Sequence, residues 1–124
     1  MKKKIESKKG PQSVGPYSPG IIANNIIFLS GQLGMDTDGN IVSDDIVEQT
    51  QYVFKNIGIL LNEVGLDYSH IVKTTVYLTD MNDFSKVNEE YEKYFKKIYP
   101  ARSCIEISRL PKGGKVEIEC IACY

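Results

Sequence analysis

Residues 100–122 have the sequence PARSCIEISRLPKGGKVEIECIA, in which two strand-like segments flank a turn. Segments 102–108 and 116–122 are rich in β-branched residues and alternate in side-chain character, as strands with two unlike faces do. The residues between them contain Pro111, Gly113 and Gly114, which break regular structure. The stretch therefore predicts two strands near the C-terminus.

The alternation predicts which side chains of these strands share a face. One side of the first strand would carry Arg102, Cys104 and Glu106, and one side of the second would carry Glu117 and Glu119. These charges suit a face that no helix covers. We expect that face to be partly wet or partly buried against another chain.

Two helices are expected upstream. Asp45 and Glu48 have the spacing of a capping box, so a helix should begin there and end at Gly65. Residues 84–98 carry an apolar stripe and a wet face, and Pro100 follows them. This pattern predicts a second amphipathic helix over 84–98.

Further β-rich segments complete the expected fold. Residues 21–30 predict a hairpin that turns at Asn24 and Asn25, and residues 71–79 predict another strand. The resulting order β, β, α, β, α, β, β is α+β, with two helices on one face of a mixed sheet. We find no linker or repeat, so residues 1–124 are expected to form a single domain.

Composition restricts the chemistry. The chain has 124 residues with one histidine, His70, and two arginines, Arg102 and Arg109. A metal site of several imidazoles is therefore excluded, and the chemistry of an enzyme with this composition is expected to rest on carboxylates, an arginine, hydroxyls and backbone groups. The odd count of three cysteines favours a reducing compartment. No apolar segment suits a membrane span or a signal peptide, so the expected location is the cytoplasm.

The N-terminus is basic. Residues 1–9 carry a charge of +4, whereas the remainder carries −5. A basic segment can bind nucleic acid or an acidic partner. We favour a frayed, solvated terminus, because phosphate binding normally uses a larger basic face.

Arg102 and Glu117 are the leading candidates for chemistry, each with a structural alternative. Arginine can hold a carboxylate with two parallel hydrogen bonds, or it can form an ion pair with Glu106, Glu117 or Glu119. A glutamate beside an arginine stays ionised and can exchange a proton with water or an amine. Alternatively, Glu117 is a charge that protects a strand from aggregation.

Other candidates carry weaker signals. Cys104 can be a nucleophile or a small buried residue, and the spacing of Cys120 and Cys123 is not expected to form a redox or zinc motif on a strand. Tyr17 lies in a rigid loop that either lines a cleft or covers the core. Asn88 lies beside the apolar stripe of the second helix and needs a polar partner.

Several short motifs occur in an order that resembles one family. They are Gly15-Pro16-Tyr17-Ser18, Ser30-Gly31-Gln32, Gln49-Thr50, residues 73–78 (KTTVYL), Asp83-Phe84, Val87-Asn88, Pro100-Ala101-Arg102-Ser103 and Val116-Glu117-Ile118-Glu119. Together they resemble the reactive intermediate deaminase A (RidA, or YjgF) family across nearly the whole chain.

The resemblance implies a chorismate-mutase-like fold and a homotrimer with ligand clefts between subunits. It implies hydrolysis of 2-imino acids, such as 2-iminobutanoate and 2-iminopropanoate, or their enamines, to 2-oxo acids and ammonia without a cofactor. The matching positions make Arg102 the carboxylate anchor, Glu117 the residue that handles water and Tyr17 the cleft tyrosine. Ser30, Gly31, Asn88 and Cys104 match positions that line the cleft.

Two other functions stay open. Some members of the family are described as RNA-binding proteins or ribonucleases that inhibit translation, and the basic residues 1–9 favour that function. The acidic remainder and the absence of an RNA-reading motif argue against it. A trimer that binds 2-oxo acids or acts as a chaperone without turnover is the third hypothesis.

Overall fold

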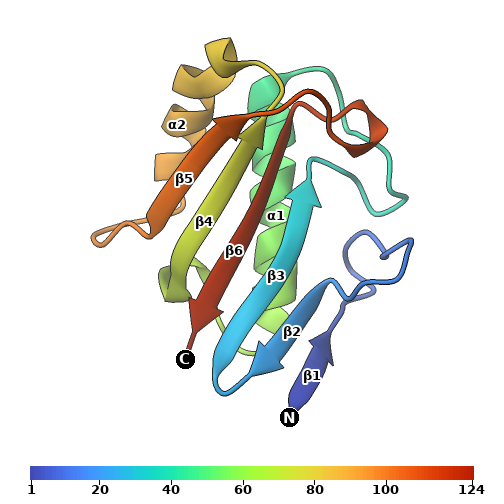
Figure 1. Cartoon of the computed structure of the whole chain (residues 1–124), viewed down its shortest axis with the longest axis vertical. Helices are drawn as coiled ribbons and strands as arrows, with labels where there is room; N and C mark the ends of the chain where they lie inside the picture. Colours follow the sequence, from blue (N-terminus) through green and yellow to red (C-terminus); the bar gives the residue numbers. More distant parts are fainter.

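A computed structural model describes all 124 residues of the protein. One sheet contains all six strands, in the order β1-β2-β3-β6-β4-β5 (Figure 1). The strands are β1 (Lys2–Ile5), β2 (Gly20–Ala23), β3 (Ile26–Leu33), β4 (Ile71–Leu78), β5 (Ala101–Glu106) and β6 (Val116–Cys123). β4 and β5 are parallel and every other pair is antiparallel, so the sheet is mixed.

Two helices, α1 (Ile46–Glu63) and α2 (Phe84–Glu92), lie on one side of this sheet (Figure 1). Alternate residues of β6, from Val116 to Ala122, are buried beneath them, with Glu117, Glu119 and Ile121 on the other side. The predicted α+β architecture is confirmed. The bare face carries the charges of Glu117 and Glu119, as expected.

Turn and cap residues in the sequence predicted the ends of several strands and helices correctly. The β2–β3 hairpin turns at Asn24 and Asn25, with φ values of 50° and 63° that asparagine tolerates. The Asp45 side chain accepts a hydrogen bond from the Glu48 backbone N–H and caps α1. Gly65 follows α1 with a φ of 73°, which favours glycine at a helix end.

The expectation of a frayed N-terminus is wrong. Residues Lys2–Ile5 form the edge strand β1, which pairs antiparallel with β2. Ile5 is only 2% exposed and joins the core, which holds the strand in place. The three preceding lysines are exposed on the edge, where charge discourages pairing with another chain.

The second helix is shorter than predicted. α2 ends at Glu92, and the next three backbone N–H groups, through Phe95, bond to carbonyls three residues back. This tighter turn buries Phe95, whereas Ile98 is 92% exposed. Periodicity alone did not predict this change of direction.

Strand β5 also ends earlier than the sequence predicted, because it stops at Glu106 and not at Ser108.

No helix in the structure combines the length and apolar character needed to cross a membrane.

Candidate functional site

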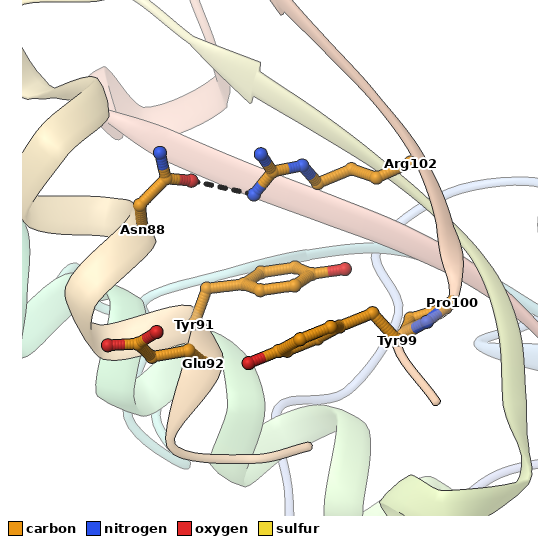
Figure 2. A pocket seen from close by; sticks show the side chains of 6 residues that line it. All are labelled: Asn88, Tyr91, Glu92, Tyr99, Pro100 and Arg102. Atoms are coloured by element: carbon orange, nitrogen blue, oxygen red, sulfur yellow. Dashed lines mark hydrogen bonds between the residues drawn. The ribbon is translucent and has the colours of Figure 1, made fainter. Parts of the chain in front are cut away.

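Arg102 lies on the helix side of the sheet. It pairs in register with the buried Thr74 of the parallel strand β4, so its side chain extends toward α2. Its Nη1 donates to Asn88 Oδ1 over 2.7 Å (Figure 2). The guanidinium carbon lies 4.8 Å from the ring centre of Tyr91 and 5.5 Å from that of Phe84. A polar group and two aromatic rings therefore hold the cation.

Arg102 forms no ion pair within the chain. Glu106 accepts instead from the backbone N–H of Met81, and Glu119 from the hydroxyl of Tyr77. The alternative in which Arg102 pairs with Glu106, Glu117 or Glu119 is therefore wrong for the single chain. The guanidinium retains hydrogen-bond donors for an anion.

A cavity of about 550 Å³ lies beside this guanidinium. Figure 2 shows the six residues that line it: Asn88, Tyr91, Glu92, Tyr99, Pro100 and Arg102. Asn88 thus has the polar partner that its position required. Tyr91 and Tyr99 were not among the predicted site residues. Helix periodicity marks the buried Tyr91 only as core, and Tyr99, which is 55% exposed, lies beyond the end of α2 and outside every quoted motif.

Cys104 and Cys120 show no sign of activation. Cys104 is half-buried on the same side as Arg102, and burial raises the pKa of its thiol although the Arg102 charge opposes the shift. Burial raises the pKa of Cys120 to about 12. Cys120 and Cys123 point to opposite faces of β6, as expected for this spacing on a strand. No three His, Cys, Asp or Glu side chains gather closely enough to hold a metal ion.

Glu117 lies on the bare face of the sheet. It pairs in register with Leu33 of β3 and Tyr77 of β4. Partial burial raises the pKa of the Glu117 carboxyl above its usual range, and the charge of Glu119 is the second, smaller cause of this rise. A carboxyl with a raised pKa is better suited to exchange protons near neutral pH.

Gly31 makes room for Glu117. A Cβ atom at Gly31 would lie 2.6 Å from Glu117 Cδ, so any larger residue would displace the carboxyl group. Ser30 and Gly31 lie at an irregularity in the β3–β6 pairing, between Leu29 and Gln32. This bulge brings the β3 backbone against the glutamate.

Two hydrogen bonds from Ser30 hold the loop that carries Tyr17 against β3. The Ser30 hydroxyl donates to the carbonyl of Ser18 over 2.7 Å, and its backbone N–H donates to the carbonyl of Pro19 over 2.9 Å. Tyr17 is 52% exposed and lines a hollow of about 30 Å³ together with Gly31. Tyr17, Ser30, Gly31 and Glu117 therefore form a second group.

The predicted site residues fall into two groups that do not meet in one chain. The arginine group is Arg102, Asn88 and Cys104 on the helix side. The glutamate group is Glu117, Gly31, Ser30 and Tyr17, centred on the bare face. The expectation that an arginine lies beside Glu117 is wrong within one chain, because strand alternation directs the two side chains to opposite faces.

Comparison with known proteins identifies the family. Residues 7–124 match the sequence model of the Endoribonuclease L-PSP family. The Homo sapiens protein named 2-iminobutanoate/2-iminopropanoate deaminase is 42% identical over 98% of this chain and 90% of that protein. Reactive Intermediate Deaminase A, chloroplastic, from Arabidopsis thaliana is 48% identical over 98% of this chain and 65% of that protein.

Solved structures agree with these matches. A Rid-family protein of unknown function, YyfA from Yersinia pestis, superposes with a TM-score of 0.97 at 47% identity and full coverage of both chains. TdcF from E. coli, solved with bound serine, gives a TM-score of 0.93 at 37% identity over 98% of each chain. The chain belongs to the Endoribonuclease L-PSP family of α+β proteins. Within it, the resemblance to reactive intermediate deaminase A is confirmed.

Proposed function

We propose that the protein hydrolyses short 2-imino acids, 2-iminobutanoate and 2-iminopropanoate, to 2-oxo acids and ammonia. The observation that carries this proposal is an arginine held by a neutral amide and two rings, with no acidic partner, beside a cavity. Such a group is an open site for a carboxylate. The deaminase names of the relatives support the same reaction.

Arg102 would bind the substrate carboxylate and so fix the position of the neighbouring C=N carbon. A planar guanidinium matches a carboxylate with two parallel hydrogen bonds. The bond from Nη1 to Asn88 leaves the other guanidinium N–H groups for the ligand. Because this contact is present both before and during the attack of water, it contributes to affinity and to KM.

Glu117 would move the protons. In its carboxylate form it takes a proton from water as the water oxygen bonds to the iminium carbon, which gives a neutral carbinolamine. The protonated Glu117 then donates to the amine nitrogen, the C–N bond breaks, and ammonia leaves. The remaining hydroxyl loses its proton to the Glu117 carboxylate, which yields the 2-oxo acid. The protonated Glu117 then passes this proton to the departing ammonia or to solvent, which restores the carboxylate. A carboxyl with a raised pKa is suited to both directions of transfer.

This mechanism needs both groups in one cleft, so we include in the proposal a homotrimer with clefts between copies. The arginine group of one copy would meet the glutamate group of the next. Support comes from the opposite placement of the two groups and from apolar side chains exposed on the bare face, with Phe28 44% and Ile105 46% exposed. Exposed apolar surface of this kind favours association. The proposed compartment is the cytoplasm, in keeping with three free cysteines.

Subunit mixing tests the reaction and the shared cleft together. Imine would be generated by a pyridoxal-phosphate lyase, and the appearance of 2-oxo acid followed with and without the protein. At an imine concentration well below the KM of the Arg102→Ala variant, Arg102→Ala and Glu117→Gln should each retain only a small fraction of the native rate when alone. After co-refolding at equal amounts, about one quarter of the clefts should combine an intact arginine with an intact glutamate, which restores activity. Mixed trimers without recovered activity would contradict the shared cleft.

A ribonuclease function is the second candidate, favoured by the description of the matched family and by the exposed lysines of β1. These lysines also serve as edge protection. Replacement of Lys2, Lys3 and Lys4 by Glu would abolish RNA binding under this hypothesis and leave imine hydrolysis unchanged. Binding of a 2-oxo acid without any imine hydrolysis would instead favour the non-catalytic trimer.

A further inference from the structure

Arg102 is held in place by residues that sequence motifs did not mark. Tyr91 lies below the guanidinium in Figure 2, at 4.8 Å from ring centre to the guanidinium carbon. An arginine side chain has several rotatable bonds, so its fork is useful for a carboxylate only when something fixes its plane. Asn88 fixes one nitrogen, and the ring of Tyr91 supports the flat side of the cation.

Tyr91 is itself fixed by a second contact. Its hydroxyl lies 2.7 Å from Thr74 Oγ1, where either oxygen can donate. Thr74 is completely buried and Tyr91 is 5% exposed, so water does not compete with this bond. An edge-to-face contact with Phe54 and a tilted contact with Phe95 confine the ring further.

The sheet register joins these contacts into one unit. Thr74 of β4 is the residue directly beside Arg102 of β5. The pairing of β4 with β5 therefore fixes the backbone position of Arg102. The hydroxyl bond between Thr74 and Tyr91 fixes the aromatic ring that lies against the guanidinium. Neither Thr74 nor the Tyr91 hydroxyl has to touch a ligand for this arrangement to act on Arg102.

We propose that Tyr91 and Thr74 are positioning residues, whose hydroxyl bond holds the aromatic platform that orients Arg102 for a substrate carboxylate. The inference rests on the proposed role of Arg102 as carboxylate anchor and adds residues to it. It predicts an effect on carboxylate affinity and KM. The effect on kcat at saturation should be small, because the bond between Thr74 and Tyr91 acts on Arg102 and not on Glu117, the group that moves the protons.

The test uses Tyr91→Phe, Thr74→Val and the double variant, each of nearly native shape. Each single variant leaves one buried hydroxyl without a partner and should lower Tm. The double variant removes both hydroxyls, so its Tm should recover. If the bond positions Arg102, the Kd for 2-oxobutanoate should rise about three- to tenfold in Tyr91→Phe and stay raised in the double variant.

The matched control is Tyr94→Phe. Tyr94 belongs to the same aromatic cluster, and its hydroxyl donates to the buried Glu90 over 2.9 Å, away from Arg102. This variant should lower Tm with an unchanged Kd. A Kd that follows Tm across all four variants, and so recovers in the double variant, would show a merely structural role and overturn the inference.

A second readout applies even to a variant of low yield. The chain has only two arginines, so the Nε–H signals of Arg102 and Arg109 can be distinguished with Arg109→Lys. The Arg102 Nε–H should be more rigid than that of Arg109 in the native protein and should lose this difference in the double variant. Equal mobility of the two signals in the native protein would overturn the inference.

The outcomes also separate this inference from the proposed function. An unchanged Kd in Arg102→Ala would overturn the anchor, and the positioning role with it. A raised Kd in Arg102→Ala beside a native Kd in the double variant would overturn the positioning role alone.

Discussion

The arginine group and the glutamate group use opposite physical means to prepare a side chain. Around Arg102, aromatic rings and an amide hold a cation without neutralising it. Around Glu117, partial burial and a second carboxylate make the negative charge less favourable, so the pKa rises. The first environment is suited to bind a charge that stays fixed. The second environment is suited to a carboxyl group that takes up and releases a proton during the reaction.

This difference implies that the two groups control different kinetic constants. The arginine group should set affinity and KM, and the glutamate group should set kcat. The following changes test that division, in order of decreasing effect.

Glu117→Gln should lower kcat for imine hydrolysis by about 10³-fold, because an amide cannot accept and return the proton. The Kd for 2-oxobutanoate should change by no more than about threefold, since Arg102 still binds the carboxylate. Steady-state kinetics and calorimetric titration give the two values. Equal losses in kcat and affinity would contradict the assignment of kcat to the glutamate group and of affinity to the arginine group.

Arg102→Ala should weaken 2-oxobutanoate binding by roughly 30- to 100-fold, the loss expected for two charge-assisted hydrogen bonds. Calorimetric titration measures it. The control is Arg109→Ala, which removes the other exposed arginine of the chain. Weaker binding in both variants would point to general electrostatic attraction, not to a specific anchor.

Gly31→Ala should lower kcat about tenfold with little change in KM, because the new methyl group displaces the Glu117 carboxyl by contact. The displaced atoms end a flexible side chain, so the variant should fold. Gly10→Ala is the matched control, since its Cβ would meet only ordinary contacts at 3.6 Å from Ile59. A native kcat in Gly31→Ala would show that the position of the carboxyl is not critical.

Glu119→Gln should shift the acidic limb of the kcat profile to lower pH. The Glu119 charge raises the pKa of Glu117, so its removal lowers that pKa and keeps Glu117 ionised in more acidic solution. The hydroxyl of Tyr77 can still donate to the amide oxygen. A pH–rate profile measures the shift, and Glu63→Gln serves as a control that removes an exposed charge at the end of α1. A shift to higher pH would contradict the assigned cause.

The sequence was most informative where a short-range rule applies. The Asp45 cap, the turn at Asn24 and Asn25, and the alternation of β6 each depend on residues a few positions apart, and each was predicted correctly. Strand β1 and the end of α2 were missed. Both depend on Ile5 and Phe95 finding places in a core assembled from distant segments.

For the candidate site, motifs named the residues but not their arrangement. Arg102, Asn88, Glu117 and Gly31 were all chosen from the sequence, and the contacts Arg102–Asn88 and Gly31–Glu117 show two real clusters. The platform under Arg102 went unrecognised, because a buried tyrosine on a helix stripe has the same pattern whether or not it supports a cation.

The sequence by itself determined the fold class, the local turns and caps, and which side chains alternate along each strand. These follow from steric rules that act over a few residues. Only the tertiary structure decided which face each strand turns toward the helices, and therefore that Arg102 and Glu117 lie on opposite sides of the sheet. Alternation fixes faces within one strand, whereas the pairing order of β6, β4 and β5 and the packing of α2 relate the faces of different strands.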